Sequence, residues 1–530
     1  MYLNQPLILL LEHLGVDGQY LFLLQQNAIA EVSTVRTCLP DASRAFSQHG
    51  LGASFRLPSL FQNLRSQLNL DLKVTGRPVI RHQLVDSCLW FGVTHILREI
   101  KYRARIPVPG SYTLIGVPDE WDCLNEGEIF ATIFDPRTGD LLPIEGRVVV
   151  TRSPQLHPGD LQLVQAVRRT QLEHLRNVVV FPSKGFRSMP SMLAGGDLDG
   201  DIFNLILDPK LHSHYNATPA SYEGLPDKVV PSPCTVDDVA RFFVDYVKSD
   251  LLGYISILHR RCADVGSPSD DICVQLAEHA SHAVDYPKTG AAVNFRDLPR
   301  PPSREKPDFL AAEGVDPTNH PAYYPSPKIL GRLFRNVPME ADSMDEEEYL
   351  EPTAASVIRT ALRGIDTTAL DLPPLSQPSD DDLSPMRDLF EAYIDQLRTI
   401  AHAHSLSTYY RLSEGELVSG MIHARWTDRR RRQRSVAMMN IETQELAKAV
   451  RRELYGDDGG DVNEVVAQHD DDRVRRRGSF TRAYAAWLVS EEILESDPGA
   501  FGPQSFGLIA LGVLLEMVKQ SRQMVYGSAW

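Results

Sequence analysis

The hydrophobic pattern divides the chain into a helical start, a β-rich middle and a helical remainder. Apolar residues recur at helical spacing before residue 102, at Leu7, Leu10, Leu11, Leu14, Leu84, Cys88, Leu89, Val93 and Ile96. These repeats predict helices over residues 1–102, joined by a Ser- and Gly-containing connection at residues 43–57.

From residue 103 the pattern changes to that of short strands. Runs rich in β-forming residues, separated by Gly and Pro turns, occupy residues 111–117, 128–134, 147–151, 177–181 and 201–207. Short strands with polar loops predict a small closed barrel rather than alternating strands and helices. The predicted fold class is therefore α+β, with a small β-barrel over residues 103–210 flanked by helical regions before and after.

Helical patterns return after the barrel. Runs at 236–259 and 269–284 lie in a helical or mixed region, residues 211–370, which also holds a Pro-rich stretch at 298–307 and an acidic one at 340–351. A last helical domain is predicted at 385–530, interrupted by the Gly- and Asp-rich residues 456–472.

Composition narrows the classes of protein. With 530 residues, 43% hydrophobic and 23% charged, the chain has the balance of a folded, soluble protein. A net charge of −16 argues against bulk coating of nucleic acid but leaves room for one basic channel. Six scattered cysteines without a C-x-x-C pair suggest neither a zinc ribbon nor a disulfide framework. We expect no membrane insertion and an intracellular location, in the nucleus, the cytoplasm or both.

The sharpest motif is the acidic loop, Gly195-Gly196-Asp197-Leu198-Asp199-Gly200-Asp201. Carboxylates at every second position of a tight loop can point at one place, and Gly200 permits a conformation that other residues avoid. Three converging carboxylates repel one another unless a cation lies between them. Hard divalent ions, above all Mg²⁺, prefer such oxygen ligands.

Three other interpretations compete with a magnesium site. A calcium EF-hand needs glycine at loop position six, where this chain has Ile202. A haloacid-dehalogenase-like phosphatase also has a D-x-D-G segment, which normally follows a buried apolar strand and ends in Thr or Ser. In this chain residues 191–196 precede the D-x-D-G segment, and Asp201 ends it. The remaining alternative is a solvated acidic turn.

Upstream segments favour a polymerase. Residues 146–160 (GRVVVTRSPQLHPGD) place an R-x-P-x-L-H segment about forty residues before the D-x-D-G-D loop. This arrangement resembles the catalytic double-psi β-barrel in the largest subunit of cellular DNA-dependent RNA polymerases. Further segments resemble successive signatures of the eukaryotic RNA-directed RNA polymerases of RNA silencing: 177–201, ending GGDLDGD; 245–264, DYVKSDLLGYISILHRRCAD; 283–290, AVDYPKTG; and 306–309, KPDF.

The resemblance implies a function and a set of site residues. Asp197, Asp199 and Asp201 match the family's catalytic, metal-binding aspartates, with Mg²⁺, or Mn²⁺ in its place, as the cofactor. Ribonucleoside triphosphates and a single-stranded RNA template are the implied substrates, and other RNA-silencing proteins are candidate partners. The resemblance also implies that residues 103–210 form the catalytic barrel, residues 211–370 complete the active site, and residues 385–530 form a head-like domain.

Four more residues are implied as substrate contacts, namely Arg152, His157, Lys184 and Lys288. Arg152 lies where related DNA-dependent enzymes use an arginine to recognise the hydroxyls of the incoming sugar. His157 and Asp160 close the same loop, where we expect orienting hydrogen bonds. Lys184 and Lys288 could supply positive charge to phosphates.

The family's chains extend further at the amino end, where a second barrel contributes basic residues to the triphosphate. The chain thus resembles a carboxyl-terminal portion that carries half of the nucleotide site. Two hypotheses remain, a polymerase catalytic segment and a catalytically incompetent remnant that scaffolds RNA-silencing proteins.

Overall fold

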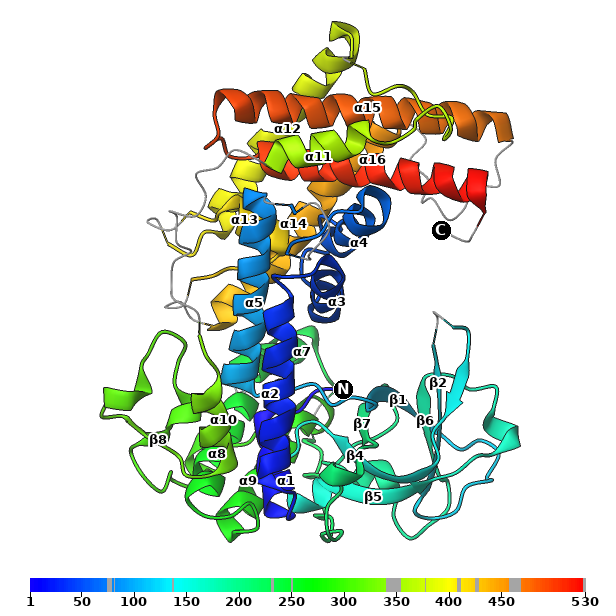
Figure 1. The fold of residues 1–530 in the computed structure, drawn as a ribbon. Helices are drawn as coiled ribbons and strands as arrows, with labels where there is room; N and C mark the ends of the chain where they lie inside the picture. The colour runs from blue at the N-terminus through cyan, green and yellow to red at the C-terminus, as the bar shows by residue number, and fades with distance from the viewer. Residues whose placement is uncertain are drawn as a thin grey trace. The chain divides into compact units, whose positions relative to one another are not determined.

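A computed structural model describes most of the chain (Figure 1). The described residues are 1–73, 79–80, 82–135, 138–229, 233–248, 251–339, 354–376, 378–407, 411–424, 429–456 and 469–527. The predicted acidic linker at 340–351 and most of the predicted interruption at 456–472 lie outside these ranges.

Two compact units share the chain. One combines Met1–Ala28 with Glu99–Pro338, and the other combines Ile29–Arg98 with Met339–Trp530. Each unit is thus built from segments that are distant in sequence. The division into four consecutive domains stays a prediction.

The first unit contains a closed β-barrel. Its strands are β1 (Tyr112–Pro118), β2 (Glu128–Phe134), β3 (Leu141–Pro143), β4 (Gly146–Arg152), β5 (Leu161–Ala166), β6 (Val178–Phe181) and β7 (Ile202–Ile206). The order is β3-β2-β5-β4-β7-β1-β6, and pairing of β6 with β2 closes six of the strands into a ring, with β3 added at the outside of β2. β1–β6 and β2–β5 are parallel pairs among antiparallel ones. The predicted closed barrel and the α+β class are confirmed.

The barrel encloses one apolar core. Alternate residues of the strands point inward because side chains of a strand alternate between its faces. The buried cluster consists of Leu114, Ile129, Ala131, Ile144, Val148, Val150, Val164, Ala166, Val179, Phe181, Met189, Leu193, Phe203 and Leu205. The predicted strands match five of the observed ones within two residues at each end, while β3 and β5 were not predicted.

Helices complete the first unit. They are α1 (Gln5–His13), α6 (Met189–Met192), α7 (Val236–Lys248), α8 (Leu252–Val265), α9 (Asp271–Thr289) and α10 (Ile329–Asn336), with a short pair of strands, β8 (Lys306–Pro307) and β9 (Tyr323–Tyr324). Two helices, α2 (Gly18–Thr34) and α5 (Gln83–Arg103), continue from one unit into the other along the chain. α8 and α9 pack on each other, and α1 contacts α8 and α10.

The second unit is helical in the part that the structure describes. Its helices are α3 (Leu39–His49), α4 (Leu57–Leu68), α11 (Ala354–Arg363), α12 (Asp380–His404), α13 (Glu414–Ser419), α14 (Arg429–Tyr455), α15 (His469–Ser496) and α16 (Pro503–Tyr526). α15 and α16 pack along each other (Figure 1). In the described ranges, each helix is too short or too polar to span a bilayer.

The predicted connection at residues 43–57 is wrong over its first half. Residues up to His49 belong to α3, whose buried residues are Leu39, Ala42, Ser43 and Phe46. Ser43 is buried, and its hydroxyl donates to the Pro58 carbonyl oxygen at 2.8 Å. The helix ends only at Gly50, which has φ +66° and caps the last turn in the left-handed conformation.

Candidate metal centre

The acidic loop joins α6 to β7 and is fixed to the barrel at both ends. Leu193 is part of the buried barrel core, and Leu198 packs against that core from within the loop. At the far end, the Asp201 carbonyl oxygen accepts a hydrogen bond from the Gly116 amide of β1 at 3.0 Å. Gly116 has to lack a side chain, because a Cβ there would come within 2.4 Å of Phe203 Cε2 and 2.9 Å of Leu198 Cδ2.

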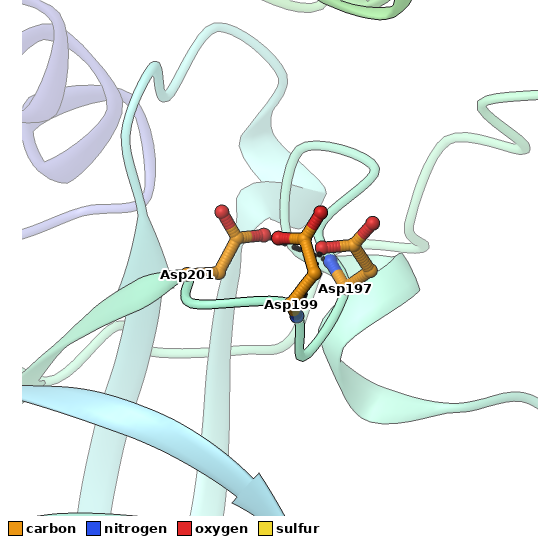
Figure 2. Close-up of side chains that lie close together, drawn as sticks. All are labelled: Asp197, Asp199 and Asp201. Atoms are coloured by element: carbon orange, nitrogen blue, oxygen red, sulfur yellow. Dashed lines mark hydrogen bonds between the residues drawn. The ribbon is translucent and has the colours of Figure 1, made fainter. Parts of the chain in front are cut away.

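Three carboxylates converge on the outer side of this loop. One oxygen from each of Asp197, Asp199 and Asp201 lies within 4.8 Å of the others, and Figure 2 shows the three side chains pointing the same way. Asp199 is exposed, and the other two are half-buried. The loop backbone helps to hold them, since the Asp197 amide donates to Asp201 Oδ2 at 2.8 Å.

Arg152 holds one member of the triad. β4 and β7 are antiparallel neighbours, and their register sets Arg152 opposite Phe203, two residues after Asp201. The guanidinium therefore reaches Asp201 with two nitrogens, Nε to Oδ2 at 2.6 Å and Nη2 to Oδ1 at 2.9 Å. Both side chains are largely buried, and such a bidentate pair fixes the plane of the carboxylate.

Lys288 reaches the other two members. It lies in the last turn of α9, and its Nζ is 2.7 Å from Asp197 Oδ2 and 3.6 Å from Asp199 Oδ2. The hydrogen bond from Lys288 lowers the pKa of Asp197, and the same bond raises the pKa of Lys288. A cation at the C-terminal end of a helix is also favoured by the helix dipole.

Asp160 ties the Arg152 loop to the acidic loop. Its buried carboxylate accepts from the amides of Leu156 at 2.9 Å, His157 at 2.8 Å and Ala194 at 3.0 Å, and from the Tyr222 hydroxyl at 2.6 Å. Burial raises the pKa of Asp160 to about 6, and these hydrogen bonds oppose the rise. Tyr222 was not predicted from the sequence, because the residues around it carry no periodic pattern.

His157 and Lys184 have hydrogen-bond partners outside the acidic loop. His157 caps the short 3₁₀ turn at Pro158–Asp160, with Nδ1 accepting from the Gly159 amide at 3.0 Å, and burial lowers its pKa. Lys184 Nζ donates to the Asp122 carbonyl oxygen at 2.6 Å. Of the four predicted substrate contacts, Arg152 and Lys288 are therefore brought to the acidic loop, and Lys184 is bound to Asp122. Their roles toward substrate stay predictions.

The donor set fits a hard divalent cation. All three groups offer carboxylate oxygens close enough to share one ion, which is the ligand type that Mg²⁺ and Mn²⁺ accept. The ammonium of Lys288 already sits beside two of them, so the loop attracts positive charge.

Comparison with known proteins adds the decisive observation. Residues 1–337 match the family model described as RNA dependent RNA polymerase, and this stretch holds the whole barrel and the acidic loop. The chain belongs to the RNA-dependent RNA polymerase family.

Individual relatives agree with the family. RNA-dependent RNA polymerase 1 of Arabidopsis thaliana is 32% identical over 340 residues, which cover 63% of this chain and 29% of the relative. RNA-dependent RNA polymerase 1 of Schizosaccharomyces pombe is 36% identical over 266 residues, 45% of this chain and 21% of that protein. The probable RNA-dependent RNA polymerase 2 of Oryza sativa subsp. japonica is 28% identical over 476 residues, 86% of this chain and 38% of that one.

A solved structure is also similar. The RNA dependent RNA polymerase QDE-1 from Thielavia terrestris has 18% identity and a TM-score of 0.46, with 99% of this chain and 57% of that chain covered. In the three sequence comparisons above, the chain spans well under half the length of its relatives.

Proposed function

We propose that this chain carries the metal-binding half of an RNA-directed RNA polymerase active centre. It would act in magnesium-dependent nucleotidyl transfer that makes complementary RNA on a single-stranded RNA template from ribonucleoside triphosphates. We assign this activity to RNA silencing inside the cell, in the nucleus, the cytoplasm or both, with silencing proteins as partners. The observation that carries the proposal is the convergence of Asp197, Asp199 and Asp201 within 4.8 Å on the barrel of a polymerase family member.

The three aspartates would hold Mg²⁺, or Mn²⁺ in its place. When bound, the ion would neutralise charge on the reacting phosphate and lower the barrier to attack by the 3′-hydroxyl of the growing RNA. Phosphoryl transfer of this kind needs positioning and charge compensation more than a nucleophilic side chain. The loop offers these two things, because its carboxylates are oriented by Arg152 and by backbone amides.

Arg152 and Lys288 would act on the substrate in different ways. Arg152 engages Asp201 with Nε and Nη2, which leaves the guanidinium anchored beside the metal ligands and suited to ordering the sugar of a nucleotide. Lys288 is 59% exposed in its side chain and can turn toward a phosphate without breaking the core. His157 would maintain the conformation of the loop that leads from Arg152 to Asp160.

Metal binding is the direct test. We would titrate the purified chain with Mn²⁺ and follow free ion by electron paramagnetic resonance, with Mg²⁺ as competitor, for wild type and Asp199→Asn. The variant keeps the size of an exposed side chain, so its fold should be retained, and we expect its affinity to fall by about two orders of magnitude. Equal affinity in both proteins would sink the proposal.

Incorporation of ribonucleotides then separates the two hypotheses. The polymerase hypothesis predicts Mg²⁺-dependent synthesis on a single-stranded RNA template when the chain is supplied with the amino-terminal region of a relative, and none with Asp199→Asn. The alternative, a catalytically incompetent scaffold in RNA silencing, predicts no synthesis with either protein, although the wild type binds the metal.

A further inference from the structure

A strap formed by residues 218–223 crosses both loops of the metal centre. Thr218 and Pro219 lie over Gly159, where an added Cβ would come within 2.5 Å of the Thr218 carbonyl oxygen. Tyr222 lies over Gly195, where an added Cβ would come within 3.5 Å of Tyr222 Cβ. The absence of a side chain at Gly159 therefore lets the strap pack directly on that loop backbone, and at Gly195 the strap lies at van der Waals distance.

The strap is itself held at Tyr222. Tyr222 has φ +51°, a left-handed conformation that costs free energy for a residue with a side chain and persists only where the surroundings impose it. Arg187 Nη2 donates to the carbonyl oxygen of the preceding Ser221 at 3.0 Å, and His282 Nε2 donates to that of the following Glu223, also at 3.0 Å. His282 belongs to α9, the helix that also presents Lys288.

The Tyr222 hydroxyl belongs to a hydrogen-bond network centred on the Asp160 carboxylate. It donates at 2.6 Å to Asp160 Oδ1, the same oxygen that accepts from the Ala194 amide. Ala194 and Gly195 both have positive φ, +54° and +65°, and together they turn the chain into the acidic loop. The hydroxyl therefore acts on the backbone three residues before Asp197, through one buried carboxylate.

We propose that Tyr222 is a positioning residue of the metal centre, which through Asp160 fixes the turn at Ala194 and so the spacing of the three aspartates. The inference rests on the proposed function, since it assigns Tyr222 a task at that same site. Groups that orient metal ligands from behind commonly change metal affinity by about 10- to 100-fold when they are removed. Tyr222 would act through Asp160, to which its hydroxyl donates, and not as a metal ligand.

The test is Mn²⁺ titration of wild type, Tyr222→Phe, and Tyr215→Phe as a matched control. Tyr215 lies on the same connection but is 53% exposed, so loss of its hydroxyl should leave affinity unchanged. For Tyr222→Phe we expect the dissociation constant for Mn²⁺ to rise about tenfold, with a melting temperature within about 3 °C of wild type. We also expect faster hydrogen exchange at the Ala194 amide.

A double-mutant cycle with Asp160→Asn keeps the inference testable if a single variant is unstable. Because both residues act through one hydrogen bond, the loss in the double variant should be smaller than the two single losses added together. Unchanged affinity in Tyr222→Phe, with binding lost in Asp199→Asn, would overturn the role of Tyr222 and leave the proposed function intact. No binding by wild type would instead remove the proposed function itself.

Discussion

Asp201 and Asp197 lie four residues apart on one loop, and their positive partners differ in burial and in geometry. Asp201 is gripped by two guanidinium nitrogens of Arg152, and the two side chains are 17% and 13% exposed. Asp197 meets a single ammonium, Lys288, and these side chains are 47% and 59% exposed. Water screens the second pair and hardly reaches the first.

The difference indicates how the site divides its work. A buried bidentate pair is rigid, so the Asp201 end gives the loop a fixed frame. An exposed lysine exchanges partners easily, so the Asp197 end can admit a cation or a phosphate. We call these the anchored end and the open end of the acidic loop. The predictions below test that distinction.

The largest effect is expected at the anchored end, from Arg152→Ala. Removing the guanidinium leaves the largely buried Asp201 carboxylate without its ion-pair partner, which should lower the free energy of unfolding by about 3 to 5 kcal/mol. Saturating Mg²⁺ should restore part of the loss, because a bound cation stabilises the folded state by mass action. Urea denaturation with and without Mg²⁺ measures both.

Arg152→Lys is the matched variant, because it keeps the positive charge and loses the two guanidinium nitrogens that bind Asp201 together. We expect its free energy of unfolding to lie between those of wild type and Arg152→Ala. If Arg152→Ala changed stability by no more than an exposed substitution does, the anchored end would not exist as described.

The next effect is a pH dependence that Asp160 causes. Its pKa is raised from 3.8 to about 6, so the folded state takes up a proton before the unfolded state as pH falls. The resulting stabilisation is fully present below pH 3.8 and is lost as pH rises through 6. Relative to Asp160→Asn, the stability of wild type should therefore rise by about 2 to 3 kcal/mol between pH 7 and pH 4. A difference that stays flat over this range in paired denaturation curves would contradict the assignment.

Two glycines of the loop should oppose substitution by alanine for different physical reasons. At Gly196 a Cβ would come within 2.6 Å of Arg152 Cδ, so Gly196→Ala should displace the arginine. At Gly200 nothing lies within 4 Å of a Cβ, and only the φ of +126° opposes the change. We expect each variant to cost about 1 to 3 kcal/mol of stability.

The Arg152→Ala background separates the two causes. There the cost of Gly196→Ala should shrink, because the clashing side chain is gone, while the cost of Gly200→Ala should stay the same. Equal behaviour of the two glycines in denaturation experiments would refute a steric link between Gly196 and Arg152.

The smallest effect belongs to the open end. Lys288→Met should raise the affinity for Mg²⁺ by less than about fivefold at low salt, because an exposed ion pair contributes at most about 1 kcal/mol. The gain should fade at high salt as screening weakens the competing lysine. Calorimetric titration at two ionic strengths measures it, with Lys184→Met, whose amine is bound to Asp122, as the control. A lower affinity in Lys288→Met would mean that the lysine supports metal binding instead of competing with it.

Much of the barrel was predictable because strands leave a local signal. Residues 128–134 and 147–151 are runs of apolar and β-branched residues, and β2 and β4 lie there. β5 was missed because two glutamines, Gln162 and Gln165, interrupt its apolar run. Gln162 is buried in the strand, where its side-chain amide donates to the carbonyl oxygens of Gly159 at 2.8 Å and Ala217 at 3.1 Å.

By itself, the sequence determined five of the barrel strands and the acidic loop with its three carboxylates. These follow from neighbouring residues, whose spacing and chemistry are written in order along the chain. Only the tertiary structure decided which side chains serve the loop, because strand register and helix packing bring distant residues together. Arg152, Tyr222 and Lys288 reach the centre from β4, the strap and α9, across separations of 49, 62 and 91 residues to Asp201, Asp160 and Asp197. No local pattern encodes contacts over such separations, since they form only when the barrel closes and its helices pack on it.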